Sequence, residues 1–248
     1  MQLSKLLTTM GRNDARLVGR DQMMIGLVMY PLVMVLVLAF GFRPLTSWLL
    51  STASFDLGPY WSIAVAYGLV TAMPMFFGIV FGMLLIEEEE DGTLIAMMVT
   101  PLSLDRFVGY RAFAAAALSF MLMVVTLPLI GIITLPPVSI LPIAFLAALS
   151  APMNALFFFS LAANRVQAFG MLKVISTVNV LPLIAFFVPV PWQYILGLFP
   201  PYWVAKATWE AAAGNPYWFY FIPGLILYGI YLYVLVNRFQ TKAYSGVV

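Results

Sequence analysis

The chain has 248 residues, of which 63% are hydrophobic and only 9% are charged, and its formal net charge is +2. This composition lies far outside the range of soluble globular domains, so the sequence predicts an all-α integral membrane protein. The small charge and the lack of a long basic run give no reason to expect nucleic acid as a partner. Cysteine and histidine are absent. Their absence excludes disulfides, thiolate nucleophiles and histidine-dependent catalysis, and no catalytic, cofactor-binding or metal site is expected.

Residues 1–21 predict an amphipathic arm that lies along the inner surface of the membrane. Apolar residues recur in this arm near helical spacing, and the basic residues between them are Lys5, Arg12, Arg16 and Arg20. An apolar run long enough to span a membrane follows the arm. The N-terminus is therefore not expected to be a cleavable signal.

Apolar runs predict six membrane spans, at about residues 23–40, 60–86, 107–135, 140–163, 174–188 and 217–236. The second span contains Gly78 and Gly82, a spacing of small residues that lets another helix approach closely. A loop is expected at residues 43–59, after the first span, and a short polar link at 167–173, before the fifth.

Residues 189–216 do not fit the pattern of a full span. Prolines interrupt them at positions 189, 191, 200 and 201, and the remaining apolar stretch contains Lys206 and Glu210. A re-entrant or interfacial helix at residues 202–213 is therefore predicted, on the outer side of the membrane. The turn residues Gly214, Asn215 and Pro216 would end it.

The basic residues predict the orientation of the chain. Ten of the twelve Lys and Arg residues fall in the arm, in the loop between the second and third spans with the start of the third span, near Arg165, or in the C-terminal tail. The positive-inside rule then places both termini in the cytoplasm, in the plasma membrane of a bacterium or archaeon. The tryptophans agree, because all six lie in or beside the loops assigned to the outer face.

Residues 87–103, with the sequence EEEEDGTLIAMMVTPLS, are the one place where dense charge interrupts the apolar sequence. The five carboxylates at 87–91 are expected in water, where the second span leaves the membrane. A short apolar helix over residues 94–99 is expected next, stopped by Thr100 and Pro101. At ~10 Å it is too short to span a bilayer, so it either lies on the lipid headgroups or docks in the groove of a partner. The candidate docking residues are Glu87, Glu90, Asp91, Gly92, Thr93, Leu94, Ile95, Met97, Met98, Thr100 and Pro101.

The runs Glu90-Asp91-Gly92-Thr93 and Thr100-Pro101-Leu102-Ser103 resemble the E-x-G-T…T-P-L-S signature of ABC-2 type transporter permeases. The resemblance implies that residues 87–103 are the coupling segment that docks on an ABC ATPase subunit, which binds ATP and Mg. It also implies one ABC-2 type transmembrane domain over residues 1–248, paired with a second permease half in a homodimer or heterodimer. Family members commonly have Arg or Lys among these glutamates, whereas Glu88 and Glu89 are both acidic here. More loosely, T-x-x-A-x-x-V-T-P-L is similar to permeases of the fluoroquinolone-export type.

No predicted span carries Asp, Glu or His in its middle, where secondary transporters usually place their coupling ion sites. No P-loop motif occurs, so the chain is not expected to hydrolyse ATP itself. With the resemblance, these observations predict the permease subunit of an ATP-driven exporter of hydrophobic or amphipathic substrates, such as drugs, lipids or peptides. Two alternatives stay open. One is a non-transporting scaffold or immunity-type protein that binds a cytoplasmic regulator, and the other is an intramembrane enzyme of lipid metabolism, for which a second polar constellation is missing.

The substrate path is expected to be lined by soft apolar side chains and the two most polar residues within the spans. The candidates are Met73, Met75, Phe76, Phe77, Asn154, Phe157, Phe158, Phe159 and Asn179. For each of them, packing against lipid or inside the bundle is the alternative interpretation.

Overall fold

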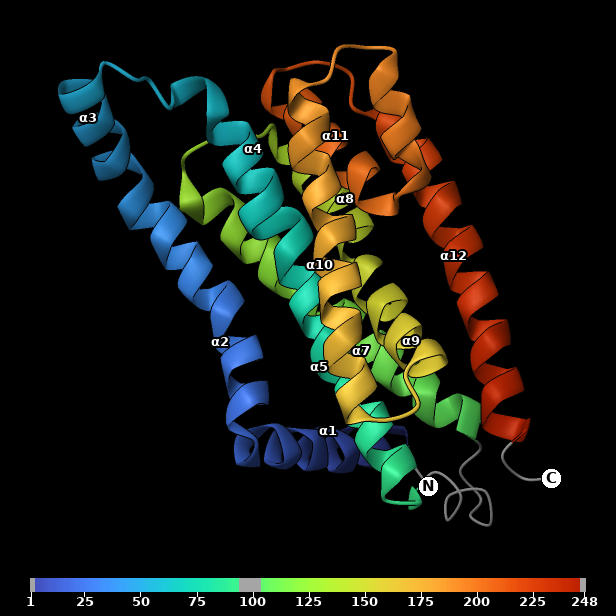
Figure 1. Ribbon diagram of the computed structural model, residues 1–248. Helices are drawn as coiled ribbons and strands as arrows, with labels where there is room; N and C mark the ends of the chain where they lie inside the picture. Colours follow the sequence, from blue (N-terminus) through green and yellow to red (C-terminus); the bar gives the residue numbers. More distant parts are fainter. Residues whose placement is uncertain (1–2, 94–103, 246–248) are drawn as a thin grey trace.

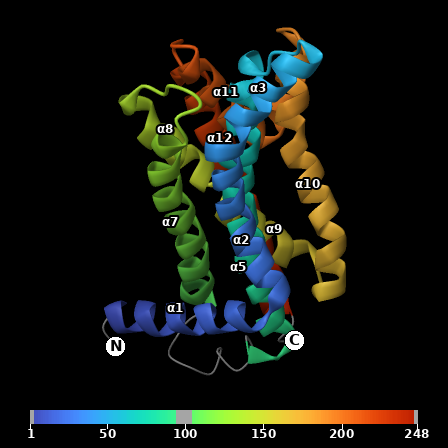
Figure 2. The same cartoon turned by 90° about the vertical axis from the view of Figure 1, so that its left-hand side faces the viewer.

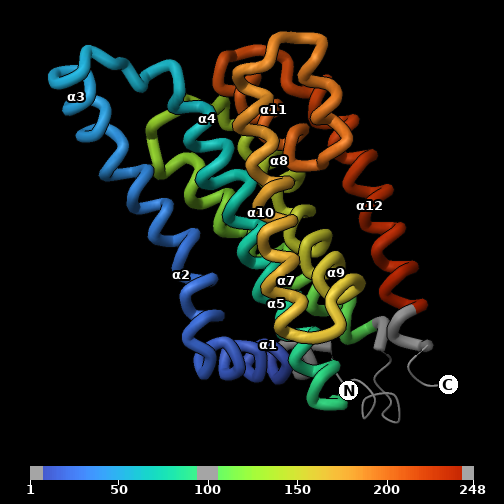
Figure 3. The backbone as a smooth tube through the Cα atoms, viewed as in Figure 1, coloured from blue at the N-terminus to red at the C-terminus, as the bar shows by residue number. Residues whose placement is uncertain are grey.

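The computed structural model describes residues 3–93 and 104–245, and within these residues the chain is helical and forms no strand. Six helical rods in these ranges are long and apolar enough to cross a membrane, which confirms the predicted all-α membrane fold (Figure 1). The rods are Gln22–Ala53, Gly58–Glu90, Arg106–Ile130, Pro137–Leu161, Arg165–Phe187 and Trp218–Thr241. The last rod belongs to helix α12 (Trp218–Ser245), which ends at the same end of the bundle as helix α1 (Leu3–Arg20) (Figure 3). We call this end the arm end.

Helix α1 lies across the foot of the bundle rather than along it, beneath α2 (Gln22–Leu36), α5 (Ala72–Glu90) and α7 (Leu104–Ile130) (Figure 2). The helical form predicted for the arm is thus confirmed. Asp21 makes the sharp turn into α2 possible, because its carboxylate accepts hydrogen bonds from the backbone N–H groups of Met23 (2.8 Å) and Met24 (3.3 Å). A side-chain acceptor at this position satisfies donors that the first turn of a helix leaves unpaired.

The first rod continues well beyond the predicted span. A π-helical segment, Val37–Gly41, joins α2 to α3 (Phe42–Ala53), so the loop expected at residues 43–59 is wrong over most of its length. Pro44, in the first turn of α3, has no N–H to donate and so removes a hydrogen bond from the continuous rod directly after the π-helical segment. Only at Ser54, with a φ of 53°, does the chain leave the helix.

The second rod is the centre of the bundle. It consists of a 3₁₀ turn (Gly58–Tyr60), α4 (Trp61–Val65), a second π-helical segment η3 (Ala66–Thr71) and α5. Nearly all side chains of its apolar part are buried against other helices. Gly78 and Gly82 lie against α9 (Ser150–Leu161): a Cβ on Gly78 would stand 2.5 Å from the carbonyl oxygen of Ala151, and one on Gly82 would stand 2.9 Å from Phe158 Cβ. The close helix approach predicted from this glycine spacing is confirmed.

The remaining rods differ from the predicted spans at their ends. Helix α7 ends at Ile130, because Gly131 takes a φ of +61°, and the fourth rod divides at Leu149 into α8 (Pro137–Ala148) and α9. Helix α10 (Arg165–Phe187) begins nine residues before the predicted fifth span, so the expected polar link is wrong. The Asn164 side chain accepts from the Gln167 N–H (2.9 Å), and the Gln167 side chain accepts from the Ala163 N–H (2.9 Å). These two bonds pair backbone N–H groups at the start of the helix, which therefore begins within the polar residues.

The prediction of a non-spanning helix before the last rod is confirmed. A 3₁₀ segment, Trp192–Leu198, leads into α11 (Pro200–Ala212), which sits at the end of the bundle opposite the arm. Tyr202, Ala205 and Thr208 are fully buried, so α11 is inserted among the rods. Lys206 and Glu210, one turn apart on this helix, pair with each other at 3.0 Å.

The glycine face of α5 provides a test of this packing. Gly78→Ala would drive a methyl group into the backbone of α9, and overpacking of this kind typically costs about 1–3 kcal/mol. We expect a lower thermal unfolding midpoint of the purified chain in detergent. The control is Gly229→Ala in α12, where no heavy atom lies within 4 Å of the new Cβ, and its midpoint should be unchanged or higher. Equal midpoints for the two variants would contradict the α5–α9 contact.

Candidate functional site

The candidate site lies at the arm end, where the chain leaves α5 and returns through α7. Residues 94–101 of the predicted docking set, Leu94 to Pro101, lie outside the described residues. Of the others, Glu87 and Glu90 belong to the last turn of α5, Asp91 and Gly92 form the turn after it, and Thr93 is the last residue described before the gap. Gly92 has a φ of +69° and donates its N–H to the Glu89 carbonyl at 3.1 Å. This left-handed end of a helix explains why the motif has glycine here.

A buried ion cluster joins α5 to its neighbours at this end. Arg111 of α7 donates from the same terminal nitrogen, Nη2, to Glu88 Oε1 of α5 (2.7 Å) and to Asp14 Oδ1 of α1 (2.8 Å). Arg111 is fully buried, and Asp14 and Glu88 are 7% and 6% exposed. The prediction that all five carboxylates at 87–91 lie in water is therefore wrong for Glu88, because this carboxylate is buried with a cationic partner.

The cluster has more charge than one arginine can neutralise. Two carboxylates share one guanidinium, which leaves a formal charge of −1 when all three groups are ionised. Asp14 Oδ2 and Glu88 Oε2 are buried without a hydrogen-bond partner among the described residues. Burial raises the pKa of Asp14 above its ordinary value, and the neighbouring Arg111 guanidinium opposes that rise.

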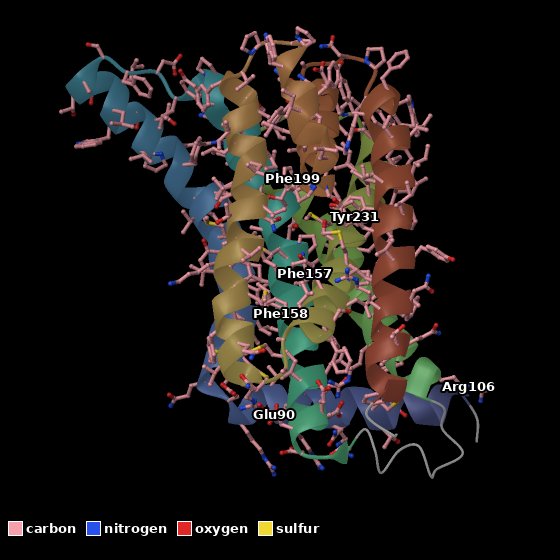
Figure 4. The ribbon with its side chains drawn as sticks, turned by 45° about the vertical axis from the view of Figure 1, so that its right-hand side comes forward. Glu90, Arg106, Phe157, Phe158, Phe199 and Tyr231 are labelled. Carbon is pink, nitrogen blue, oxygen red and sulfur yellow. The ribbon has the colours of Figure 1, made fainter. Side chains whose placement is uncertain are left out.

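A second, half-exposed ion cluster surrounds Arg165 at the start of α10. Its guanidinium pairs with Glu87, with Glu90 at 3.9 Å and with Asp21 at 3.7 Å. Its backbone N–H also donates to Glu90 Oε1 at 3.0 Å, and Figure 4 labels Glu90 at this end of α5. We call the two ion clusters together the collar; its residues are Asp14, Asp21, Glu87, Glu88, Glu90, Arg111 and Arg165. Through the collar, α5 is linked to α7 and to α10. Asp14 of α1 joins the Arg111 cluster, and Asp21 before α2 joins the Arg165 cluster.

Three cavities are lined in part by residues that were predicted to line the substrate path. The arm cavity, about 530 Å³, lies between α1, α2, α5 and α7 and includes Phe77. The α12 cavity, about 280 Å³, lies between α9, α10 and α12 and includes Asn154 and Phe157. Phe157 is labelled in Figure 4 with Phe199 and Tyr231, two further lining residues between α10 and α12.

The third cavity brings together more of the predicted residues than the others. This α2–α10 cavity, about 190 Å³, is bordered by α2, η3, α5 and α10, and it includes Met75, Phe76 and Asn179. Met73, Phe158 and Phe159 are fully buried in the core and line none of the three cavities. The predicted path residues therefore do not form one continuous lining.

The α2–α10 cavity is the most polar surface inside the spans that these cavities offer. Its polar residues are Tyr30, Tyr67, Ser176 and Asn179. Asn179 donates to the Ile175 carbonyl at 2.9 Å, and its Oδ1 has no partner among the described residues, so this oxygen can accept a hydrogen bond from a ligand. Ser176 and both tyrosines were not predicted from the sequence. Ser176 and Asn179, three residues apart and therefore on one face of α10, were the available signal.

The described residues offer no cluster of acidic side chains suited to hold a metal ion. The three cavities offer mainly apolar and hydrogen-bonding contacts. Such surfaces can bind and release a molecule without changing it.

Comparison with known proteins identifies similar export permeases. The family model described as "Fluoroquinolones export permease protein Rv2686c-like" matches residues 14–236. Two relatives from Mycobacterium tuberculosis are each 30% identical over 240 residues, which is 96% of this chain and 95% of theirs. They are fluoroquinolones export permease protein MT2760 (strain CDC 1551 / Oshkosh) and fluoroquinolones export permease protein Rv2686c (strain ATCC 25618 / H37Rv). No solved structure matches the chain.

The buried part of the collar should matter more to stability than the exposed part. Arg111→Leu would leave Asp14 and Glu88 buried without a counter-charge, and removal of one partner from a buried pair typically costs about 3–5 kcal/mol. Arg165→Leu breaks half-exposed pairs and should cost about 1 kcal/mol or less. Thermal unfolding in detergent should show a much larger loss for Arg111→Leu. Equal losses would mean that the buried cluster contributes no more than the exposed one.

Proposed function

Because the chain belongs to the Rv2686c-like family of fluoroquinolone export permeases, we propose that it is the membrane-spanning subunit of an ATP-driven exporter. A separate ABC ATPase subunit binds ATP and Mg, since this sequence contains no P-loop. The arm end faces the cytoplasm, as the positive-inside rule requires of the end that carries most Lys and Arg residues. Residues 94–103 then extend from the cytoplasmic ends of α5 and α7.

The single observation that carries this proposal is the collar. A docking segment can move a transport path only if its flanks are fixed to the helices that form the path. Here α5 is tied by ion pairs to α7 and α1 through Arg111, and to α10 through Arg165. If an ATPase subunit displaced the segment, α5 and α10 would therefore move together.

Those helices border the α2–α10 cavity, which we propose as part of the substrate path. The π-helical segment η3 supplies Tyr67 and Gly68 to its lining. Single π-helical turns are frequent at functional sites, because they widen a helix and re-aim its side chains. Met75 and Phe76 add soft apolar surface that accepts varied molecules.

A second permease half would complete the path. The outer faces of α2 and α10 are strongly apolar and exposed, including Val33, Leu36, Ile184 and Phe187. A bilayer covers such faces, and so does a second copy or a homologous half packed beside the cavity. Because the cavity lies between these two helices, pairing at this face would enclose it.

The proposed cargo is hydrophobic or amphipathic. The mycobacterial relatives are named for fluoroquinolones, which makes these drugs the first compounds to test on this chain. The cavities of this chain are lined mainly by Met, Phe, Val, Leu and Tyr rather than by charged groups. Such linings suit molecules with a large apolar surface and few polar groups.

Docking is tested by Met98→Glu. A charge placed in the short apolar segment should release the ATPase subunit from detergent-purified complexes and abolish substrate-stimulated hydrolysis, since burying an unpaired charge is costly. Met98→Leu, which keeps the apolar character, should retain both. Membrane insertion should be normal for each variant. If Met98→Glu keeps its ATPase partner and full transport, the docking assignment falls and a segment lying on lipid headgroups is preferred.

The path is tested by two neighbouring residues of α10. Ser176 lines the α2–α10 cavity and Thr177 does not, although both are exposed in the single chain. Ser176→Trp should fill much of a cavity of about 190 Å³ and reduce drug efflux from cells at least severalfold, while the ATPase subunit still co-purifies. Thr177→Trp should leave efflux near normal. The opposite order of effects would place the path on another face of α10.

A further inference from the structure

The arm cavity is the largest of the three cavities, and neither the docking segment nor the α2–α10 path uses it. Its volume of about 530 Å³ falls within the ~300–1,000 Å³ typical of small-molecule sites. It is lined by residues of α1, α2, α5 and α7. Helix α1 lies across the foot of the other three helices (Figure 2). Apolar side chains make up most of the lining, including Val28, Phe81 and Leu122.

Asp14 is the one charged residue in this lining, among the described residues. Its Oδ1 accepts from Arg111, whereas its Oδ2 is buried and has no hydrogen-bond partner among the described residues. The Tyr110 hydroxyl, which also lines the cavity, interacts with the same carboxylate. The polar end of the cavity is therefore a buried carboxylate, the one charged group among the described lining residues.

The charge balance decides what kind of ligand group fits. When all three groups are ionised, Asp14, Glu88 and Arg111 together have a formal charge of −1, and each is at least nine-tenths buried. The neighbouring basic residues of α1, Arg12 and Arg16, are exposed, so they lie on a different face of the helix from Asp14. A cationic group would complete this cluster, whereas an anionic group would meet an uncompensated carboxylate.

The cavity also opens toward the side of the bundle. Ile25 and Met29 of α2 and Leu118 of α7 line it and are 40%, 45% and 43% exposed. In a membrane this opening would face acyl chains just above the surface on which α1 lies. A molecule dissolved in that leaflet could enter without passing through water.

We propose that the arm cavity binds an amphipathic organic cation taken from the inner leaflet, with its positive group at Asp14 and its apolar body along α2, α5 and α7. This inference rests on the proposed export function and deepens it by naming the charge class of the cargo and a first binding site. An anionic phospholipid fits less well, because its headgroup would bring negative charge to the Asp14 carboxylate.

Two probes of similar size and shape but opposite charge test the proposal. The full chain in lipid nanodiscs, without an ATPase subunit, should bind tetraphenylphosphonium more tightly than tetraphenylborate. Asp14→Asn should weaken tetraphenylphosphonium binding at least severalfold, because it removes the opposite charge, and should leave tetraphenylborate binding unchanged or tighter. Asp56→Asn, the same change in the exposed loop before α4, is the matched control and should alter neither affinity.

A cavity-filling pair keeps the test decisive if Asp14→Asn fails to fold. Leu118 lines the cavity, whereas Met121 lies on the same helix, is 64% exposed and lines none of the cavities described above. Leu118→Trp should lower tetraphenylphosphonium affinity, and Met121→Trp should not. The assignment of a cation site would be overturned if Leu118→Trp and Met121→Trp changed tetraphenylphosphonium affinity equally. It would also be overturned if Asp14→Asn lowered the affinity for both probes equally.

Two further outcomes have defined meanings. Co-purification of one phospholipid at a fixed ratio, which tetraphenylphosphonium does not displace and Leu118→Trp removes, would assign the cavity to lipid and overturn the proposal. Failure of the docking test with Met98→Glu would leave these binding results untouched, because no ATPase subunit is present. Failure of the probe-binding test would likewise leave the assignment of the docking segment unchanged.

Discussion

A carboxylate that leaves water needs a cation beside it, and this constraint organises the arm end of the molecule. Helix α5 is the buried centre of the bundle, and its last turns carry glutamates. Glu88 is consequently enclosed with the helix that bears it. Arg111 meets this requirement from α7, and Asp14 of α1 joins the same guanidinium. Three elements that are far apart in the sequence are thereby fixed to one another next to the proposed coupling segment.

The spans and the arm could be predicted because they depend on local properties of the sequence. Hydropathy over about 20 residues locates a span, and prolines with interspersed charges marked the segment that forms α11. The ends of the rods were predicted less well. Helix α10 starts within polar residues because the side chains of Asn164 and Gln167 accept hydrogen bonds from backbone N–H groups at its start. Helix α3 extends the first rod because a π-helical segment continues the helix where a loop was expected.

The collar was not predicted, because its contacts join residues 23 and 97 positions apart. In sequence, five successive carboxylates look equivalent, yet each step along a helix turns the side chain by roughly 100°. Glu87 and Glu90 share one face and both meet Arg165, whereas Glu88 points to another side and meets Arg111. The same rotation separates Phe76 from Phe77, which line different cavities. Composition identified suitable residue types for a path, but only the packing of α5 decides which cavity each residue reaches.

Asp14 connects the collar with the arm cavity. One of its oxygens belongs to the ion cluster that fixes α5 and α7, and the residue itself lines the cavity that opens toward the membrane. A cation bound there would change the charge balance of the cluster, and hence the strength with which Arg111 holds α1 and α5 together. Linkage is reciprocal, so a displacement of the coupling segment that alters the Arg111 pairs would alter the affinity of the cavity by the same free energy. Cargo binding and partner docking would therefore act on one shared pair of charges, and no separate relay across the bundle is required.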